Sequence, residues 1–257
     1  MLHLETLTFD KLGERDFNRV VKLDARNWWN VLSREYGVSH IRNLHTRNEL
    51  VCGKELLRLT QRLEVFPEGQ IAVYCHEMKR PVGAISSLIL KAPTVAAVPP
   101  TWHGATGDGY FSTHDPAGDM LICASIITLH TGLPAQKISD LRKQHISSLL
   151  LLAQHTLAEK LGVPGMIAYS RPMNYAAYVA EHGPTPIADY LEVRDAQGRL
   201  HDRSIGMHER ELEAFSPGLG RPARILPGGR PLDPDSLGYN VIMDYSPTLR
   251  AHRRPGI

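Results

Sequence analysis

The sequence lacks the features that mark a secreted or membrane-spanning protein. It has no run of 18 apolar residues, and its N-terminus lacks the charged-then-apolar order of a signal peptide. The three cysteines, Cys52, Cys75 and Cys123, are odd in number and have no paired metal-ligand spacing. We therefore expect a cytoplasmic protein with buried, reduced thiols, no metal site and no membrane partner.

A strong charge imbalance is also missing. The 257 residues carry a net charge of +2, and no basic stripe is interleaved with aromatic residues, so we expect no nucleic-acid partner. The clear basic cluster, residues 250–254, lies at the C-terminus, where we expect a flexible basic tail over 247–257. The length suits one large domain, which we place at residues 1–246.

Hydrophobic periodicity predicts an α/β protein built on one mixed sheet with helices on both faces. The predicted strands are 4–9, 70–75, 81–90, 119–130, 166–170, 224–227 and 239–245, and the predicted helices are 14–29, 49–63 and 142–161. Two further segments, 92–118 and 171–220, are rich in proline and glycine. We interpret them as insertions near the functional site, the second containing two short helices.

The most informative segment is Arg142–Ser147, which precedes the helical run to Leu161 and contains no glycine. It lies between the predicted strands 119–130 and 166–170. A helix that follows a strand and a bent loop offers free N–H groups and a positive dipole end to a phosphate. One face of this helix repeats apolar residues at three- and four-residue steps: Ile146, Leu149, Leu150, Ala153, Leu157 and Leu161.

Four further segments make this pattern more specific. They are Phe66–Gln70, Arg80–Ser87, Thr106–Asp115 and Pro231–Tyr239. With them the chain resembles the GNAT superfamily of N-acetyltransferases, and within it a bacterial branch with large insertions. The resemblance covers most of residues 60–246, whereas residues 1–60 share only the order of elements.

The resemblance implies a GNAT-like fold in which the fourth strand separates from the fifth and the pantetheine arm of an acyl-CoA lies in the opening. The arm would pair with backbone at Ile127, Thr128 and Leu129. The family's phosphate loop falls on Arg142, Gln144, His145, Ile146, Ser147 and Ser148. Both of its glycines are replaced here, so a phosphopantetheine arm on an acyl-carrier protein, with one phosphate, fits as well as CoA.

Acyl transfer needs a group that moves protons and donors that polarise the thioester carbonyl. The resemblance implies that His208 lies near the thioester, and an unperturbed imidazole titrates near neutrality. We predict His208, Ser170, Tyr175 and Thr128 as the catalytic residues.

Other polar residues leave alternatives open. Tyr169, Tyr175 and Tyr178 are expected to crowd the strand opening. The alternative for Tyr175 and Tyr178 is packing in the core or at its rim. Asp108, Tyr110 and His114 either line an acceptor pocket or belong to a simple turn.

Three functions follow from these residues. The leading one is transfer of an acyl group from a CoA or carrier-protein thioester to a small acceptor, expected to be an amine. The second is decarboxylation of a malonyl-type thioester, as in GNAT-like domains of polyketide loading modules, by His208 with Ser170 or Thr128. The third is a GNAT fold that binds a ligand or partner without catalysis. The acceptor, the acyl chain and the oligomeric state are not determined by the sequence.

Overall fold

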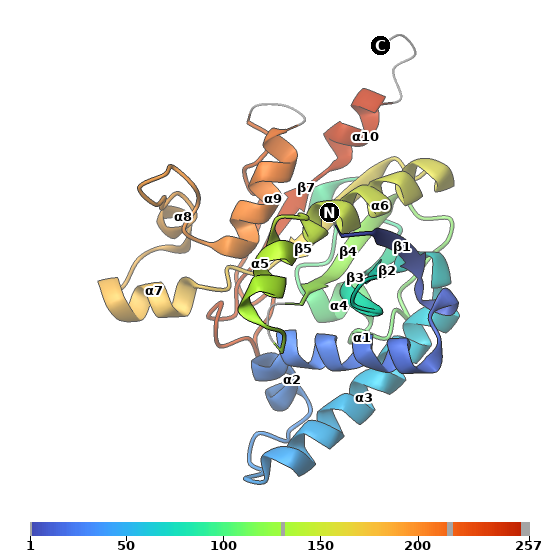
Figure 1. Ribbon diagram of the computed structural model, residues 1–257. Coiled ribbons are helices and arrows are strands. Elements are labelled where there is room, and N and C mark those ends of the chain that lie inside the picture. Colours follow the sequence, from blue (N-terminus) through green and yellow to red (C-terminus); the bar gives the residue numbers. More distant parts are fainter. Residues whose placement is uncertain (1, 130–131, 215–217, 253–257) are drawn as a thin grey trace.

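The computed structural model describes residues 2–129, 132–214 and 218–252. A seven-stranded sheet runs through these residues in the order β1-β2-β3-β4-β5-β7-β6 (Figure 1). Its strands are β1 (Leu4–Thr8), β2 (Gln70–Cys75), β3 (Arg80–Leu90), β4 (Met120–Thr128), β5 (Gly165–Ser170), β6 (Arg224–Leu226) and β7 (Asn240–Asp244). The β4–β5 pair is parallel and the other pairs are antiparallel. The predicted mixed, mostly antiparallel sheet is therefore confirmed.

Helices surround this sheet. They are α1 (Glu14–Asn27), α2 (Trp29–Glu35), α3 (Leu44–Val65), α4 (Trp102–Thr106), α5 (Ala135–Arg142), α6 (Ile146–Leu161), α7 (Tyr175–His182), α8 (Ile187–Tyr190), α9 (Arg203–Glu213) and α10 (Ser246–His252). Three short 3₁₀ turns, Phe9–Lys11, Pro67–Gly69 and Val95–Ala97, join strands and helices. Helices α7, α8 and α9 project from one side of the sheet, and α2 with the start of α3 from another (Figure 1).

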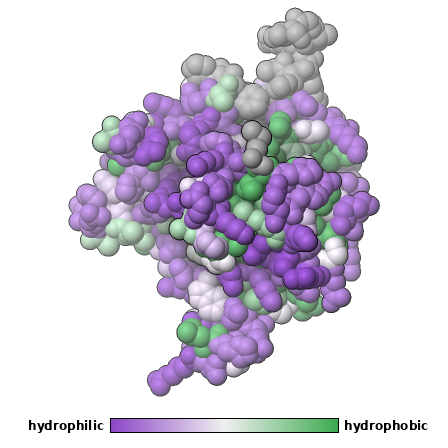
Figure 2. All heavy atoms as spheres, in the orientation of Figure 1, coloured by the Kyte–Doolittle hydropathy of each residue, from purple (hydrophilic) through white to green (hydrophobic). Residues whose placement is uncertain are grey.

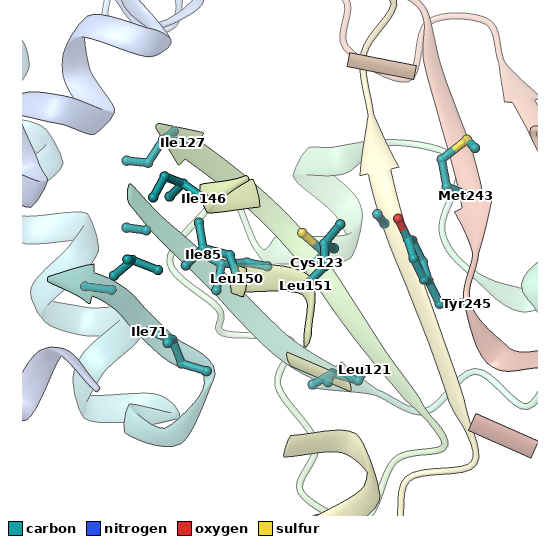
Figure 3. Packing of buried hydrophobic residues seen from close by; sticks show 14 of the residues in the cluster. Ile71, Ile85, Leu121, Cys123, Ile127, Ile146, Leu150, Leu151, Met243 and Tyr245 are labelled. Carbon is teal, nitrogen blue, oxygen red and sulfur yellow. The ribbon is translucent and has the colours of Figure 1, made fainter. Parts of the chain in front are cut away.

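The two faces of the sheet pack different elements because side chains alternate along a strand. On one face Cys123 of β4 lies beside Leu151 of α6, and Ile127 of β4 lies near Ile146 of α6, within one cluster (Figure 3). On the other face Ile122 of β4 belongs to a separate cluster with residues of α4 and of the 92–118 segment. The helices thus lie on both faces, as predicted.

A β-bulge interrupts the pairing of β3 with β4. Ser86 pairs with Ser125 and Ser87 pairs with Cys123, so Ala124 has no opposite residue on β3. Its carbonyl oxygen accepts a hydrogen bond from the indole Nε1 of Trp102 at 2.7 Å. Bulges bend a strand and redirect the side chains that follow. This bulge lies where β4 begins to separate from β5.

Several predicted boundaries are wrong. The predicted helix 14–29 is two helices, because Trp28 (φ −108°, ψ 14°) leaves the helical path. Helix α3 begins at Leu44 rather than Glu49, because the side chain of Asn43 caps its first N–H groups. Leu161, predicted on the buried face of α6, is 43% exposed.

The sequence analysis missed several helices, among them α2, α4 and one of the three helices α7, α8 and α9, where two were predicted. Helices α5 and α10 were missed as well. Helix α5 lies in the connection before the phosphate loop, and its polar composition hides it. Helix α10 occupies the start of the predicted flexible tail, and Thr248 and Leu249 on it are buried. The prediction of a flexible tail is therefore wrong for residues 247–252, and residues 253–257 lie outside the described chain. The extent of the single domain, residues 1–246, stays a prediction.

The surface is mostly hydrophilic on the face shown in Figure 2, with apolar atoms in small groups. No helix among residues 2–129, 132–214 and 218–252 combines the length and apolar character needed to cross a bilayer. Cys52, Cys75 and Cys123 are free, and burial raises the pKa of Cys123 to about 12.

Candidate active site

The parallel pair β4–β5 opens toward its carboxyl end. The two strands pair from Met120 and Gly165 to Cys123 and Ala168, and β4 then continues to Thr128 without pairing to β5. Figure 3 shows the strands close together near Leu121 and far apart near Ile127. This is the separation that the sequence analysis expected, and an arm bound there would lie beside β4.

A cavity of about 370 Å³ occupies this opening. Its walls come from the α1–α2 corner, β4, the loop before α6, the end of β5 and α9. The lining residues are Asn27, Trp28, Ser125, Ile126, Thr128, Arg142, Ser147, Tyr169, Ser170, Arg171, Met173, Arg203, Ser204, Met207 and His208. Five predicted site residues meet here: Thr128, Arg142, Ser147, Ser170 and His208.

One end of the cavity lies at the N-terminus of α6. Arg142 ends α5, and a three-residue turn leads to Ile146. His145 in this turn takes the left-handed conformation (φ 49°) that glycine adopts with least strain. Among the described residues, the backbone bonds of this helix begin with the N–H of Ser148, which donates to His145 O at 2.9 Å. The preceding N–H groups of Ile146 and Ser147 are therefore left to donate to an anion at this helix end.

The remaining predicted phosphate-loop residues do not line the cavity. Ile146 packs in the core, Gln144 is half-buried and His145 is exposed. Ser148 Oγ donates to Glu211 Oε1 of α9 at 2.5 Å, so an acidic side chain already sits beside this helix end. Their role as cofactor-binding residues stays a prediction.

Of the three residues at the end of β4 predicted to pair with the pantetheine arm, only some face the cavity. Leu129 N–H donates to Val82 O of β3 at 2.9 Å, and the side chains of Ile127 and Leu129 are buried in the core. Because peptide groups alternate along a strand, the N–H of Ile127 also faces β3. Thr128 is the one of the three whose side chain reaches the cavity, so the predicted backbone donors at Ile127 and Leu129 are wrong.

The other end of the cavity is built from buried, paired groups. Ser170 Oγ, at the end of β5, lies 2.8 Å from Ser204 Oγ at the start of α9. The carboxylate of Asp202 caps this helix by accepting from the N–H groups of Ser204 and Ile205, each at 3.0 Å. It also accepts from Tyr190 OH at 2.9 Å. The cap fixes the first turn of α9, and with it Ser204, against the strand.

His208 lies one turn further along α9 and is 1% exposed. Its Nδ1 lies 2.8 Å from the hydroxyl oxygen of Tyr245, which leaves Nε2 as the ring nitrogen available to a ligand. Burial lowers the pKa of His208 to about 3, so the ring is neutral at physiological pH. The expectation that this imidazole titrates near neutrality is therefore wrong, because the helix buries it.

An arginine and a tryptophan close this end. Trp28 Nε1 donates to Ser125 Oγ at 3.1 Å, and the guanidinium of Arg171 stacks over the Trp28 ring at 4.7 Å. Arg171 is held by Asp233 at 2.9 Å and Asp235 at 3.3 Å. Sequence analysis missed Trp28, Ser125 and Arg171 because their meeting depends on the helix break, the bulge and the turn before β7.

The predicted tyrosines have structural partners. Tyr175 OH donates to Thr185 O at 2.6 Å, and its ring packs against Tyr190 and Tyr239, away from the cavity. Tyr178 packs against Tyr190 in the same group. Tyr169 does line the cavity, but its hydroxyl donates to the carbonyl of Pro99. A catalytic role for Tyr175 has no support in this geometry.

The polar residues of the 92–118 segment are held in structural contacts. His114 Nδ1 accepts from Ile89 N–H at 3.1 Å and its ring stacks on Phe66. Tyr110 packs against Arg58, and Asp108 is a left-handed turn residue. These contacts favour the second alternative, a structural turn, for these three residues. Residues 171–220, in contrast, supply much of the cavity wall. No group of three His, Cys, Asp or Glu side chains in the described ranges is arranged to hold a metal ion.

Comparison with known proteins establishes the fold. The structure superposes on the crystal structure of the loading GNATL domain of CurA from Lyngbya majuscula with a TM-score of 0.57 and 19% identity, covering 95% of this chain and 97% of that one. It superposes on the GphF GNAT-like decarboxylase in complex with isobutyryl-CoA with a TM-score of 0.60 and 23% identity, covering 94% and 97%. The chain has the GNAT-like fold, as predicted.

Sequence comparison adds one curated relative. The chain is 30% identical over 189 residues to the probable hydrolase YhcX of Bacillus subtilis (strain 168). The match covers 73% of this chain but 32% of YhcX, so the chain spans about a third of that protein. No protein-family model matches the sequence.

Proposed function

We propose, from the GNAT-like fold and the charges that line its cavity, that the chain binds a pantetheine-linked acyl thioester and decarboxylates a malonyl-type acyl group. One observation carries this proposal. The described lining contains three arginines, Arg142, Arg171 and Arg203, and no aspartate or glutamate, since the two aspartates that pair with Arg171 lie outside the lining. Such a cavity attracts a carboxylated acyl group and a phosphate, and it repels an ammonium acceptor.

The reactive groups suit this chemistry. When Tyr245 donates to Nδ1, the neutral ring of His208 carries its proton on Nε2 and donates it to the thioester carbonyl oxygen. That hydrogen bond stabilises the enolate left when carbon dioxide departs. The paired hydroxyls of Ser170 and Ser204 are placed to donate to the same region. A histidine with a pKa of about 3 is a poor base for deprotonating an ammonium acceptor.

The phosphate end supports a donor with one phosphate. The N–H groups of Ile146 and Ser147, with Arg142, provide donors for a single phosphate. Glu211 lies beside the same helix end, where a second phosphate would be repelled. An acyl-carrier protein therefore supplies the donor better than free CoA. GphF, in complex with isobutyryl-CoA, shows that a protein of this fold binds an acyl-CoA.

The test follows the fate of the acyl group. Purified protein is incubated with methylmalonyl and propionyl thioesters, each as CoA and as carrier-protein conjugates, with and without a mixture of small amines. Mass spectrometry then identifies the products. The proposal expects methylmalonyl to become propionyl thioester without any amine. Transfer of propionyl to an amine with no loss of carbon dioxide would instead establish acyl transfer, and no reaction at all would favour a binding protein.

A further inference from the structure

A cluster of buried charges lies directly behind the cavity. It surrounds a second cavity of about 10 Å³, enough for about one water molecule. Its charged lining residues are Asp24, Glu35, Glu55, Arg58, Arg62 and Arg230. Trp28 and Ser125 line both this cavity and the larger one, so the two residues form a shared wall.

A hydrogen-bonded chain crosses this wall. Trp28 Nε1 lies 3.1 Å from Ser125 Oγ, and Ser125 Oγ lies 3.4 Å from Asp24 Oδ1. Asp24 is on α1 and is 4% exposed, whereas Ser125 follows the β4 bulge that turns its side chain toward α1. A serine hydroxyl accepts two hydrogen bonds and donates one, so it can pass a proton from one side to the other.

The surroundings of Asp24 favour its protonated form. Burial raises the pKa of Asp24 well above its ordinary value, and the nearby carboxylate of Glu55 raises it further. Glu55 Oε2 is buried without a hydrogen-bond donor among described groups, so its charge is poorly offset on the side of Asp24. Two guanidinium groups, of Arg58 and Arg62, stabilise the carboxylate that forms when this proton leaves.

We propose that Asp24 supplies the proton that completes the reaction in the larger cavity, and that Ser125 passes it to the substrate. The inference rests on the proposed decarboxylation. The bond to the carboxylate carbon breaks, its electron pair forms the enolate, and carbon dioxide leaves. The enolate carbon then takes the proton of Ser125 Oγ, while Ser125 takes the proton of Asp24. One solvent proton restores Asp24, so each turnover consumes one proton. Ser125 is thus a catalytic residue and Asp24 a positioning residue.

The cluster also provides a path to solvent. His103 on α4 is 21% exposed at its side chain and lies 3.5 Å from Glu35 Oε1. Glu35 lines the small cavity together with Glu55 and Asp24. The cavity has room for about one water molecule, which would connect Glu35 to Asp24.

The experiment measures the rate and stereochemistry of protonation. Methylmalonyl thioester is converted in D₂O by the wild type, Asp24→Asn and Ser125→Ala, and the configuration of the deuterated propionyl product is determined by NMR after derivatisation. The wild type is expected to give one enantiomer. Asp24→Asn keeps the shape of the side chain but cannot supply a carboxylic proton. It should lower turnover by roughly 10²-fold, the scale of a positioned proton donor, and give a mixture of enantiomers.

Two controls separate a relay from a structural role. Asp16→Asn removes a partly exposed carboxylate from the same helix and should change neither rate nor configuration. Ser125→Thr retains a hydroxyl, so it should give a single enantiomer where Ser125→Ala gives a mixture. This pair of variants tests the relay even if Asp24→Asn does not fold. Absence of carbon dioxide release by the wild type would overturn the proposed function and the relay together. The relay alone would be overturned if the wild type releases carbon dioxide and Asp24→Asn shows the same rate and configuration. If Asp24→Asn does not fold, the same result in Ser125→Ala would overturn it.

Discussion

The two ends of the cavity are built in opposite ways. At the phosphate end, Arg142 and His145 are exposed, and the donors are backbone N–H groups of one helix turn. At the acyl end, Ser170, Ser204 and His208 each have a side-chain partner within 2.8 Å. Binding of a phosphate tolerates adjustment, whereas stabilising an enolate requires donors already held in place. Substitutions at the two ends should therefore affect different kinetic constants.

The largest effect is expected from His208→Ala at the acyl end. Loss of the Nε2 donor should lower turnover by roughly 10²-fold or more, while donor affinity changes little because the ring does not reach the phosphate. Steady-state kinetics and calorimetry with the same donor measure both quantities. Tyr245→Phe is the matched control, since it keeps the imidazole but removes the hydroxyl that orients it. Full activity in His208→Ala would end this assignment.

Arg171→Gln should change which donor is preferred. A hydrogen bond to a charged group contributes about 2 kcal/mol, or about 30-fold in affinity, so methylmalonyl donors should bind that much more weakly. Propionyl donors, which lack the carboxylate, should bind as before. Comparison of the two dissociation constants provides an internal control for any general disturbance of the site. Equal losses for both donors would contradict a carboxylate at this end.

The buried state of His208 also predicts a pH effect on stability. Its pKa is about 3 in the folded chain and near 6.5 when unfolded, so between these values the unfolded chain binds the extra proton. Stability should therefore fall as pH drops from 6.5 toward 3, by about 1.4 kcal/mol per pH unit from this residue. Urea unfolding of wild type and His208→Gln at several pH values isolates the difference. Parallel curves would show that His208 titrates normally.

Ser147→Asp probes the phosphate end. A carboxylate at the first turn of α6 repels the phosphate and competes for the helix N-terminus, so donor binding should weaken about tenfold. Turnover at saturating donor should hold, in contrast to His208→Ala. Ser147→Ala controls for loss of the hydroxyl, and calorimetry gives the affinity. Unchanged binding in a folded Ser147→Asp variant would move the phosphate elsewhere.

The smallest difference is expected between donor carriers. Carrier-protein thioesters should be used at least as well as the matching CoA thioesters, because Glu211 opposes a second phosphate. Glu211→Gln should then improve the use of CoA relative to the carrier protein. Initial rates with matched acyl groups measure this ratio. A clear wild-type preference for CoA would show that the loop is reshaped around both phosphates.

The sequence predicted the phosphate end better than the acyl end, for a physical reason. The strand–loop–helix–strand order at residues 119–170 is a local pattern, and it placed Arg142 and Ser147 at the cavity. The acyl end depends on long-range contacts that no local pattern encodes. Trp28 meets Ser125 because a helix breaks and a strand bulges, and Arg171 is held by Asp233, 62 positions away. His208 was found through resemblance, but its burial, and so its charge state, came from tertiary packing.

The comparison between the two ends is tested most directly by a crystal structure with a bound analogue. The amide analogue of methylmalonyl phosphopantetheine keeps the phosphate, the acyl carbonyl and the carboxylate. It loses carbon dioxide far more slowly than the thioester, because an amide carbonyl accepts electrons less readily, so it occupies the site without turnover. The account predicts its phosphate at the N–H groups of Ile146 and Ser147, its carbonyl oxygen within hydrogen-bond distance of His208 Nε2, and its carboxylate toward Arg171. An analogue whose carboxylate lies at the α6 end, or whose carbonyl has no contact with His208, would contradict it.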